Sequence, residues 1–289
     1  MRNWLEYLPF ITVAKLVRAL PRHAALVLGR RLGLFARWLQ PRRQKIARDN
    51  LARAFPEKSV AEREAILRMM YAHLGTGFIE MLRLDLLREE ADLERDFVVE
   101  GEEHLRQARA EGHGCILLTG HVGFWEAGNF IFSKLGYPIG VVAKPMRNPL
   151  IDRYFLLMRE KAGGYIINSR KAARRILLAL RQNHCVGILL DQHAGRKQGV
   201  QVPFFGRPAW TTPIIAEIAM KYDVPIVPVY AWWLPDHRYR LEILPPFKLP
   251  GEPTAAQIVA NTALLTSHIE AAVRRDPSQW FWVHRRWRD

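Results

Sequence analysis

The stretch Cys115-Ile-Leu-Leu-Thr-Gly-His-Val-Gly-Phe-Trp-Glu126 decides the fold, because an apolar run stops at a glycine turn that carries a histidine and a glutamate. The run Cys115–Leu118 is typical of a buried parallel strand, and the glycines after it permit backbone angles that a side chain would forbid. We therefore expect a strand, a tight turn and the start of a helix. In open α/β sheets such a turn lies at the carboxyl end of a strand, where these folds tend to place their chemistry.

This turn predicts a catalytic pair. His121 follows the strand directly, and Glu126 in the first turn of the next helix could reach back to one imidazole nitrogen and fix its tautomer. A histidine held by a carboxylate is a candidate general base. A His and a Glu at this spacing also arise by chance. However, a polar pair between a buried strand and the aromatic Phe124-Trp125 is costly unless it is paired or functional.

Strand and helix patterns alternate through most of the chain, which predicts a mostly parallel sheet with right-handed crossovers. The alternating segment Tyr239–Leu244 predicts an antiparallel edge strand. The 289 residues show no break in composition, so we expect a single α/β domain at 41–289 behind an N-terminal helical segment at 1–40. The other expected strands are Phe97–Glu100, Ile139–Ala143, Tyr165–Asn168, Val186–Leu190 and Asp223–Tyr230.

A second site signal follows the apolar run Val186–Leu190, where Asp191, Gln192 and His193 come at a predicted strand end. Asp191 could orient a substrate, or it could only cap the turn through backbone hydrogen bonds. The two readings stay open. A metal site built from Asp191, His193 and His121 is disfavoured, because the one-residue spacing offers no further local ligand.

A basic loop, Lys144-Pro-Met-Arg-Asn-Pro149, follows another predicted strand and would share the edge of His121 if both strands are parallel. Such a loop could hold a phosphate or be only a proline-punctuated surface loop. Arg170, after the strand Tyr165–Asn168, is a further candidate for a phosphate or oxyanion contact.

The composition indicates acidic partners. A formal charge of +15 and a pI near 10.3 suit nucleic acid, anionic lipid or an acidic carrier protein. Nine tryptophans, several beside arginine, favour a membrane interface among these. Both cysteines, Cys115 and Cys185, lie in predicted buried strands, so we expect inert thiols in a reducing compartment.

The N-terminal 40 residues bear on membrane contact. Charged residues and Pro21 interrupt the apolar run Tyr7–Ala14 before the ~20 residues that a bilayer span needs, and no signal-peptide pattern is present. The segment His23–Gln40 mixes apolar residues with arginines, so it could lie in a membrane interface or pack on the protein's own core. Pro41–Lys45 is interpreted as a basic linker, and Ser59 with Glu62 predicts a capped helix start.

Several motifs in order carry a resemblance to a known family. Thr119-Gly120-His121 with Glu126 looks like the His-x4-Asp/Glu box of glycerolipid-type acyltransferases, in the Glu form of the secondary acyltransferases of bacterial lipid A biosynthesis. Further matches are Arg43–Pro56, Asn148–Asp152, Asp191-Gln192, Val202–Gly206 and the tryptophan-rich Trp280–Arg288. The chain therefore resembles the lauroyl and myristoyl acyltransferases of lipid A biosynthesis over nearly its whole length, which implies a glycerolipid acyltransferase-like fold.

The resemblance implies acyl transfer from a thioester, of acyl carrier protein or of coenzyme A, to a hydroxyl of a lipid A precursor. His121 would be the base and Glu126 would stabilise its imidazolium. The same likeness assigns acceptor binding to Lys144, Arg147 and Asn148, and it matches Asp191-Gln192 to a family block from which His193 departs. The easy departure of a thiolate leads us to expect no metal or organic cofactor.

Other functions stay open beside this one. The acceptor could be another glycolipid, such as a phosphatidylinositol mannoside, or a lysophospholipid. The chain could also be a non-catalytic lipid-binding protein, while nucleic-acid binding is the weakest alternative because no signature of it is present. We expect peripheral or monotopic attachment at the cytoplasmic face of the inner membrane.

Overall fold

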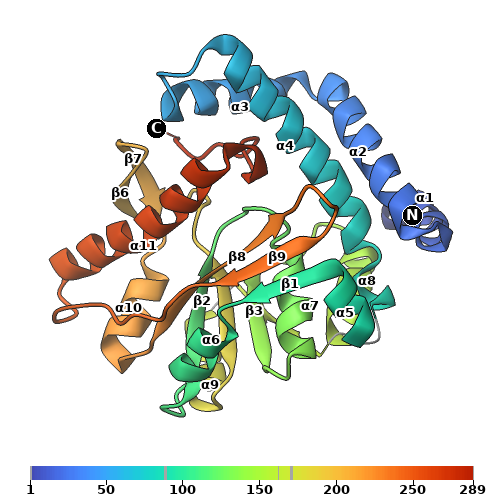
Figure 1. The fold of residues 1–289 in the computed structure, drawn as a ribbon. Helices are drawn as coiled ribbons and strands as arrows, with labels where there is room; N and C mark the ends of the chain where they lie inside the picture. Colours follow the sequence, from blue (N-terminus) through green and yellow to red (C-terminus); the bar gives the residue numbers. More distant parts are fainter. Residues whose placement is uncertain (1, 88–89, 162, 170–171, 289) are drawn as a thin grey trace.

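A computed structural model describes residues 2–87, 90–161, 163–169 and 172–288. The part of the chain that it describes contains a seven-stranded sheet of order β1-β9-β8-β2-β5-β3-β4 (Figure 1). Neighbouring strands pair in parallel except β8 with β9. This confirms the expected mixed, mostly parallel sheet. The strands are β1 (Phe97–Glu100), β2 (Cys115–Thr119), β3 (Ile139–Ala143), β4 (Tyr165–Asn168), β5 (Cys185–Leu189), β8 (Ile226–Trp233) and β9 (Tyr239–Ile243).

One strand was misplaced by the sequence pattern. Tyr239–Ile243 pairs antiparallel with β8 as expected, but it is not an edge strand, because β1 pairs in parallel with its other side. The alternation of buried and half-buried residues in β9 reported which face is covered. It carried no information about what lies beside the strand, and that is why the edge assignment was wrong.

Helices cover both faces of the sheet, so its central strands are apolar on both sides. In β2, Ile116 and Leu118 enter one core, and Cys115 and Leu117 enter the other. The first core includes residues of α9 (Ala172–Arg181), α10 (Ile214–Tyr222) and α11 (Ala255–Arg275). The second includes α6 (Glu102–Arg109), α7 (Glu126–Lys134) and α8 (Pro149–Lys161). Burial on two faces explains why the run at 115–118 does not alternate.

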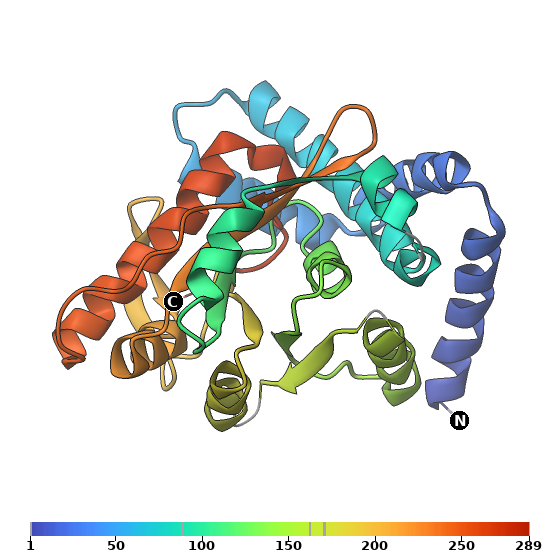
Figure 2. The same ribbon diagram turned by 60° about the horizontal axis from the view of Figure 1, so that its bottom comes forward.

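The described part of the chain begins with four long helices: α1 (Arg2–Ala19), α2 (Arg22–Leu39), α3 (Pro41–Ala54) and α4 (Val60–Met81). Figure 1 shows α2 and α4 side by side, and Figure 2 shows α1 running beside α8. The approach of α2 to α4 requires glycine, since a Cβ at Gly33 would lie 2.0 Å from the carbonyl oxygen of Tyr71. Among the helices that the structure describes, none combines the length and the hydropathy that crossing a bilayer requires.

The predictions for two helix starts had different outcomes. Ser59 and Glu62 form the expected capping box at the start of α4. Pro41–Lys45 is not a linker but the first turn of α3, because proline at the first position of a helix loses no hydrogen bond there. Helix α10 starts after Pro213 without a side-chain cap.

Short elements complete the chain. A hairpin of β6 (Val200–Phe204) and β7 (Arg207–Thr211) packs against α11. The remaining elements are the 3-10 helices η1 (Leu84–Leu86) and η2 (Pro277–Gln279) and the helix α5 (Glu90–Asp96).

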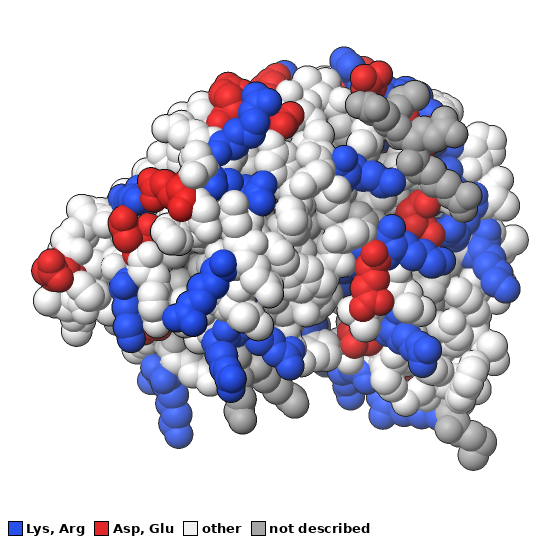
Figure 3. Space-filling view, turned by 90° about the horizontal axis from the view of Figure 1, so that it is seen from below, with Lys and Arg blue, Asp and Glu red and all other residues white. Residues whose placement is uncertain are grey.

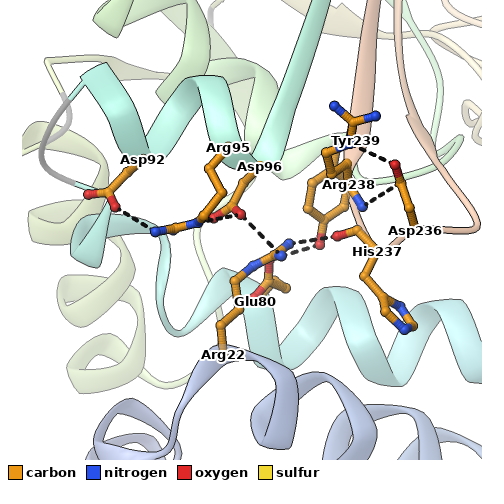
Figure 4. Close-up of polar contacts among 9 residues, drawn as sticks. All are labelled: Arg22, Glu80, Asp92, Arg95, Asp96, Asp236, His237, Arg238 and Tyr239. Carbon is orange, nitrogen blue, oxygen red and sulfur yellow. Dashed lines mark hydrogen bonds and ion pairs between the residues drawn. The ribbon is translucent and has the colours of Figure 1, made fainter.

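A network of ion pairs fastens α2 to the rest of the molecule (Figure 4). Arg22 of α2 contacts Glu80 of α4 at 3.0 Å and Asp96 of α5 at 3.2 Å. The Tyr239 hydroxyl of β9 donates to the same Glu80 carboxylate at 2.9 Å. A buried charge network contributes more to selecting one arrangement of the elements that it joins than to the free energy of unfolding. The network therefore fixes the N-terminal helices relative to the sheet.

Candidate active site

His121 and Asp191 lie together at the carboxyl ends of two adjacent strands. Thr119, the last residue of β2, pairs with Leu189, the last residue of β5, so the turns after both strands meet. His121 Nδ1 lies 2.8 Å from Asp191 Oδ1, and the backbone N–H of His121 donates to Asp191 Oδ2 at 2.8 Å. The expected strand, turn and helix start at 115–126 is confirmed, and Asp191 is the carboxylate that contacts His121.

Glu126 lies elsewhere than expected. It begins α7, and its Oε2 accepts a hydrogen bond from Arg159 Nη2 of α8 at 2.7 Å. The expectation that Glu126 holds the imidazole is therefore corrected, since Asp191 takes that place. The physical reason is the strand register, which puts Asp191 directly beside His121, whereas Glu126 is directed toward α8. Glu126 still lines the same cavity as His121, and its role in catalysis stays a prediction.

Asp191 is an anion despite its burial. Its side chain is 2% exposed, and Trp280 Nε1 donates to Asp191 Oδ2 at 2.7 Å. Burial alone would raise the pKa of this carboxyl, but the positive charge that His121 carries when it is protonated and the hydrogen bonds from His121 and Trp280 lower the pKa to about 2. Because an ionised carboxylate only accepts hydrogen bonds, His121 carries a proton on Nδ1. In the neutral form of the ring, the lone pair that can accept a proton therefore lies on Nε2.

Gln192 covers that basic nitrogen. Gln192 Nε2 lies 3.0 Å from His121 Nε2, and with Nδ1 protonated the amide is the donor. The rings of Trp125 and Phe281 lie beside the imidazole, with centroids 5.0 and 5.8 Å away. The lone pair that would accept a substrate proton is thus occupied by an amide N–H.

Two cavities meet next to the base. A polar cavity of about 310 Å³ is lined by His121, Gln192, Glu126, Arg159 and Lys144, among others. An apolar cavity of about 290 Å³ lies under α4. Its lining includes Met70, Leu74, Phe78, Met81, Phe124, Trp280 and Phe281. Trp125 and Glu126 line both cavities, so they form the wall between a charged compartment and an apolar one.

The remaining predicted residues are divided between the cavity and other places. Lys144 is exposed and lines the polar cavity, and Arg147 is exposed on the same loop. Asn148 is buried, and its Nδ2 donates to the Asn3 carbonyl at 2.9 Å and to Glu6 at 3.0 Å. Asn148 therefore ties α1 to the start of α8, and acceptor binding by it stays a prediction. Arg170 lies outside the described residues.

Sequence reasoning missed Arg159 and the role of Trp280. Arg159 lies on the third turn of α8, where the sequence alone predicts a solvent-exposed basic residue. Trp280 belongs to a segment that the family resemblance had marked without assigning a role. The two thiols also prove to be neighbours: Cys115 and Cys185 are buried and free, with Sγ atoms 3.7 Å apart across β2 and β5.

Comparison with known proteins shows that the chain is an acyltransferase. It belongs to the bacterial lipid A biosynthesis acyltransferase family, whose model matches residues 1–289. The lipid A biosynthesis lauroyltransferase of Escherichia coli (strain K12) is 30% identical over 99% of this chain and 92% of its own length. The phosphatidylinositol mannoside acyltransferase of Mycobacterium tuberculosis (strain CDC 1551 / Oshkosh) is 25% identical over 94% of this chain and 85% of its own.

A solved structure also resembles this chain. The 1-acyl-sn-glycerophosphate (LPA) acyltransferase of Thermotoga maritima matches 78% of this chain and 95% of its own, with 15% identity and a TM-score of 0.37.

Proposed function

We propose that this protein transfers a fatty acyl chain from the thioester of acyl carrier protein to a hydroxyl group of a lipid A precursor. The observation that carries the proposal is the His121–Asp191 pair at the meeting point of a charged cavity and an apolar one. Membership of the lipid A acyltransferase family supports the choice of acceptor.

His121 is the general base in this reaction. Its Nε2 takes the acceptor's hydroxyl proton as the hydroxyl oxygen forms a bond to the thioester carbonyl carbon. The anion of Asp191 stabilises the imidazolium that results. The tetrahedral intermediate then expels the thiolate, which receives the proton from Nε2, so the base is restored. General base action of this kind contributes about 10²- to 10⁴-fold, and the remainder comes from orientation and oxyanion stabilisation.

The acceptor takes the charged cavity. Lys144 and Arg159 supply positive charge there, and an arginine fork suits the planar geometry of a phosphate. Glu126 holds the Arg159 guanidinium at 2.7 Å, which fixes its direction. Through this contact Glu126 contributes to the reaction by shaping the acceptor cavity beside the base. Gln192 leaves Nε2 when the acceptor hydroxyl arrives.

The acyl chain takes the apolar cavity under α4. Its wall of methionine, leucine and aromatic side chains suits a methylene chain and offers few polar partners. An acidic carrier protein as donor is supported by the net charge of +15. Basic side chains are spread over the face in Figure 3 instead of gathering in one patch, and acidic ones lie between them. A diffuse positive field of this kind favours long-range attraction of an acidic protein.

The N-terminal helices attach the protein to the cytoplasmic face of the inner membrane. On α2, Phe35, Trp38 and Leu39 are exposed by 60, 79 and 67%, and Arg30 and Arg31 are exposed on the same helix. Exposed apolar side chains on α1 add to them, namely Trp4, Leu5, Leu8, Val13 and Leu16. Apolar side chains with arginines between them match an anionic bilayer surface.

A second acceptor has support from one observation. The relative from Mycobacterium tuberculosis is named as a phosphatidylinositol mannoside acyltransferase, so a phosphate-bearing glycolipid of another kind suits the same cavity.

The test supplies purified protein with acyl-carrier thioester or acyl-coenzyme A, and with a lipid A precursor or a phosphatidylinositol mannoside. Product is measured by mass spectrometry, and free thiol is measured by colorimetry. We expect an acylated lipid A precursor from the carrier thioester, and no turnover by His121→Ala. His113→Ala is the matched control, because His113 is exposed on a turn far along the strand from the site. Normal turnover by His121→Ala removes the base from the mechanism. Vesicle binding without thiol release from any donor indicates a lipid-binding protein.

A further inference from the structure

The C-terminal tryptophan segment is paired with the catalytic turn. The Gly123 backbone N–H donates to the Gln279 carbonyl at 2.8 Å, and the Phe281 N–H donates to the His121 carbonyl at 3.2 Å. Between these two bonds Val122 and Trp280 form an antiparallel bridge. The end of the chain therefore acts as a short strand along the turn that carries the base.

Within this segment Trp280 points inward. Its side chain is 1% exposed and packs against Trp282 and Phe204, with ring centroids 4.5 and 5.5 Å away. An indole has a single N–H donor. Trp280 uses it on Asp191 Oδ2 at 2.7 Å.

The carboxylate of Asp191 is held at both oxygens. Oδ1 faces His121 Nδ1, and Oδ2 accepts from Trp280 Nε1 and from the His121 backbone N–H. A buried carboxylate that loses a donor must recover a hydrogen bond by turning or by recruiting water. Either movement takes Oδ1 out of line with Nδ1. The direction of the imidazole, and the nitrogen on which its proton lies, thus depend on the indole.

We propose that Trp280 is a positioning residue for catalysis, which holds Asp191 so that His121 keeps its proton on Nδ1 and presents Nε2 as the base. The proposal deepens the acyl-transfer function and rests on it for its kinetic test. It gives the C-terminal segment a role at the reacting atoms beyond lining the apolar cavity, where Trp280 and Phe281 contribute to the wall. The competing explanation is that Trp280 only fills the core, as its neighbour Trp282 does.

Trp282 is the matched control for this test. It is 0% exposed, lies in the same core with its ring against Trp280, Phe55 and Phe205, and also donates from its indole, but to the Pro277 carbonyl at 2.7 Å. Trp280→Phe and Trp282→Phe therefore remove the same N–H and the same ring from the same core. They differ in the acceptor that is left without a donor, and Trp280 also lines the apolar cavity whereas Trp282 is absent from its lining.

The kinetic readout separates the two explanations. We expect Trp280→Phe to lower kcat by about 10- to 100-fold, the loss that matches one hydrogen bond to a charged group, with KM for the acceptor changed by less than about twofold. Trp282→Phe should keep kcat within about threefold of the parent at a similar loss of thermal stability. Equal losses of kcat in the two variants, or full activity of Trp280→Phe, overturn the proposal.

A second measurement does not depend on turnover. The ¹⁵N shifts of His121 in the free protein report the fraction of each imidazole tautomer. We expect the Nδ1–H form in the parent and in Trp282→Phe, and a mixture of forms in Trp280→Phe. If the parent protein transfers no acyl group while Trp280→Phe still shows the tautomer change, the proposed function alone is refuted. If the tautomer of His121 is the same in Trp280→Phe as in the parent, the role of Trp280 is refuted.

A third variant covers failure of Trp280→Phe to fold. Replacing Trp280 by 3-benzothienylalanine keeps the bicyclic shape and exchanges the N–H for sulfur. It should lose kcat and shift the tautomer as Trp280→Phe would, with its unfolding temperature close to that of the parent. Parent-like kcat and tautomer in this variant overturn the proposal.

Discussion

Replacing Asp191 by asparagine should remove the base without changing the shape of the site. The two N–H donors at Oδ2, from the His121 backbone and Trp280, require an acceptor there, so the amide oxygen of Asn takes that position. The amide NH₂ group then faces His121 Nδ1. Because NH₂ only donates, Nδ1 becomes the acceptor and the imidazole proton moves to Nε2. A protonated Nε2 in a neutral ring cannot take a proton from the acceptor hydroxyl.

The size of the effect follows from the loss of base catalysis. We expect kcat of Asp191→Asn to fall by about 10³- to 10⁴-fold, the range for a general base whose tautomer is reversed. This corresponds to about 4 to 5.5 kcal/mol of transition-state stabilisation. The assay is the release of thiol and the formation of acylated lipid at saturating donor and acceptor. Asp236→Asn, at an exposed side chain on the β8–β9 turn, is the control and should retain parental kcat.

The same variant tests the charge of Asp191 through stability. The pKa of this carboxyl falls from an ordinary value of 3.8 to about 2 in the folded protein. A lowered pKa stabilises the folded state above about pH 4, and the contribution is lost as the pH falls through about 2. It amounts to about 2 kcal/mol at neutral pH. Denaturant unfolding should therefore show Asp191→Asn less stable by roughly this amount at pH 7, with the gap closing in acid. A kcat within tenfold of the parent at normal stability would refute the reasoning about the tautomer.

Three further substitutions test the two cavities and the covered base. Gln192→Ala should expose His121 Nε2, so diethyl pyrocarbonate should modify the imidazole faster than in the parent, measured by peptide mass spectrometry. An unchanged rate would show that the Gln192 amide does not shield Nε2. Glu126→Gln should leave Arg159 with a weaker partner and raise KM for the acceptor by about tenfold, while KM for the donor stays; the reverse pattern would place Glu126 on the donor side. At Gly77 a Cβ would lie 3.6 Å from Phe124, an ordinary contact, so the rest of a leucine side chain would enter the apolar cavity. Gly77→Leu should shift the preference to a shorter acyl chain when thioesters of different chain lengths compete. An unchanged preference would show that the acyl chain does not bind in the apolar cavity.

Local patterns in the sequence predicted the elements and the position of His121 at the end of a strand, but not the carboxylate that lies beside it. The strand at 115–119 and the turn at 120–123 follow from an apolar run and glycines within one short stretch. Glu126 was chosen as the orienting carboxylate because it is near in the sequence. The carboxylate that performs this task, Asp191, is brought to His121 by the register of β2 against β5, and periodicity along one strand does not report register between two.

The same limit explains the other misses. Lys144 could be placed at the site because it ends a strand, and parallel strands share one edge. Arg159 comes from within α8, and its direction depends on how that helix packs against α7. Trp280 reaches Asp191 only because the end of the chain returns to the catalytic turn. Contacts of that kind are set by tertiary packing, so a single sequence can mark such residues as unusual without placing them.

Under the proposed mechanism, the contact of Gln192 with His121 Nε2 also limits hydrolysis of the thioester donor when no acceptor is bound. A base strong enough to take a proton from a lipid hydroxyl also takes one from water, and water would hydrolyse the thioester and waste the donor. In the structure the imidazole is 19% exposed, the rings of Trp125 and Phe281 lie beside it, and the Gln192 amide contacts Nε2. Water must compete with an amide for one lone pair in a confined space, whereas a lipid acceptor brings the binding energy of its phosphates and sugar to displace that amide. Under the proposed mechanism, the binding of the acceptor therefore uncovers Nε2, and the choice of alcohol over water depends on Gln192 as much as on His121.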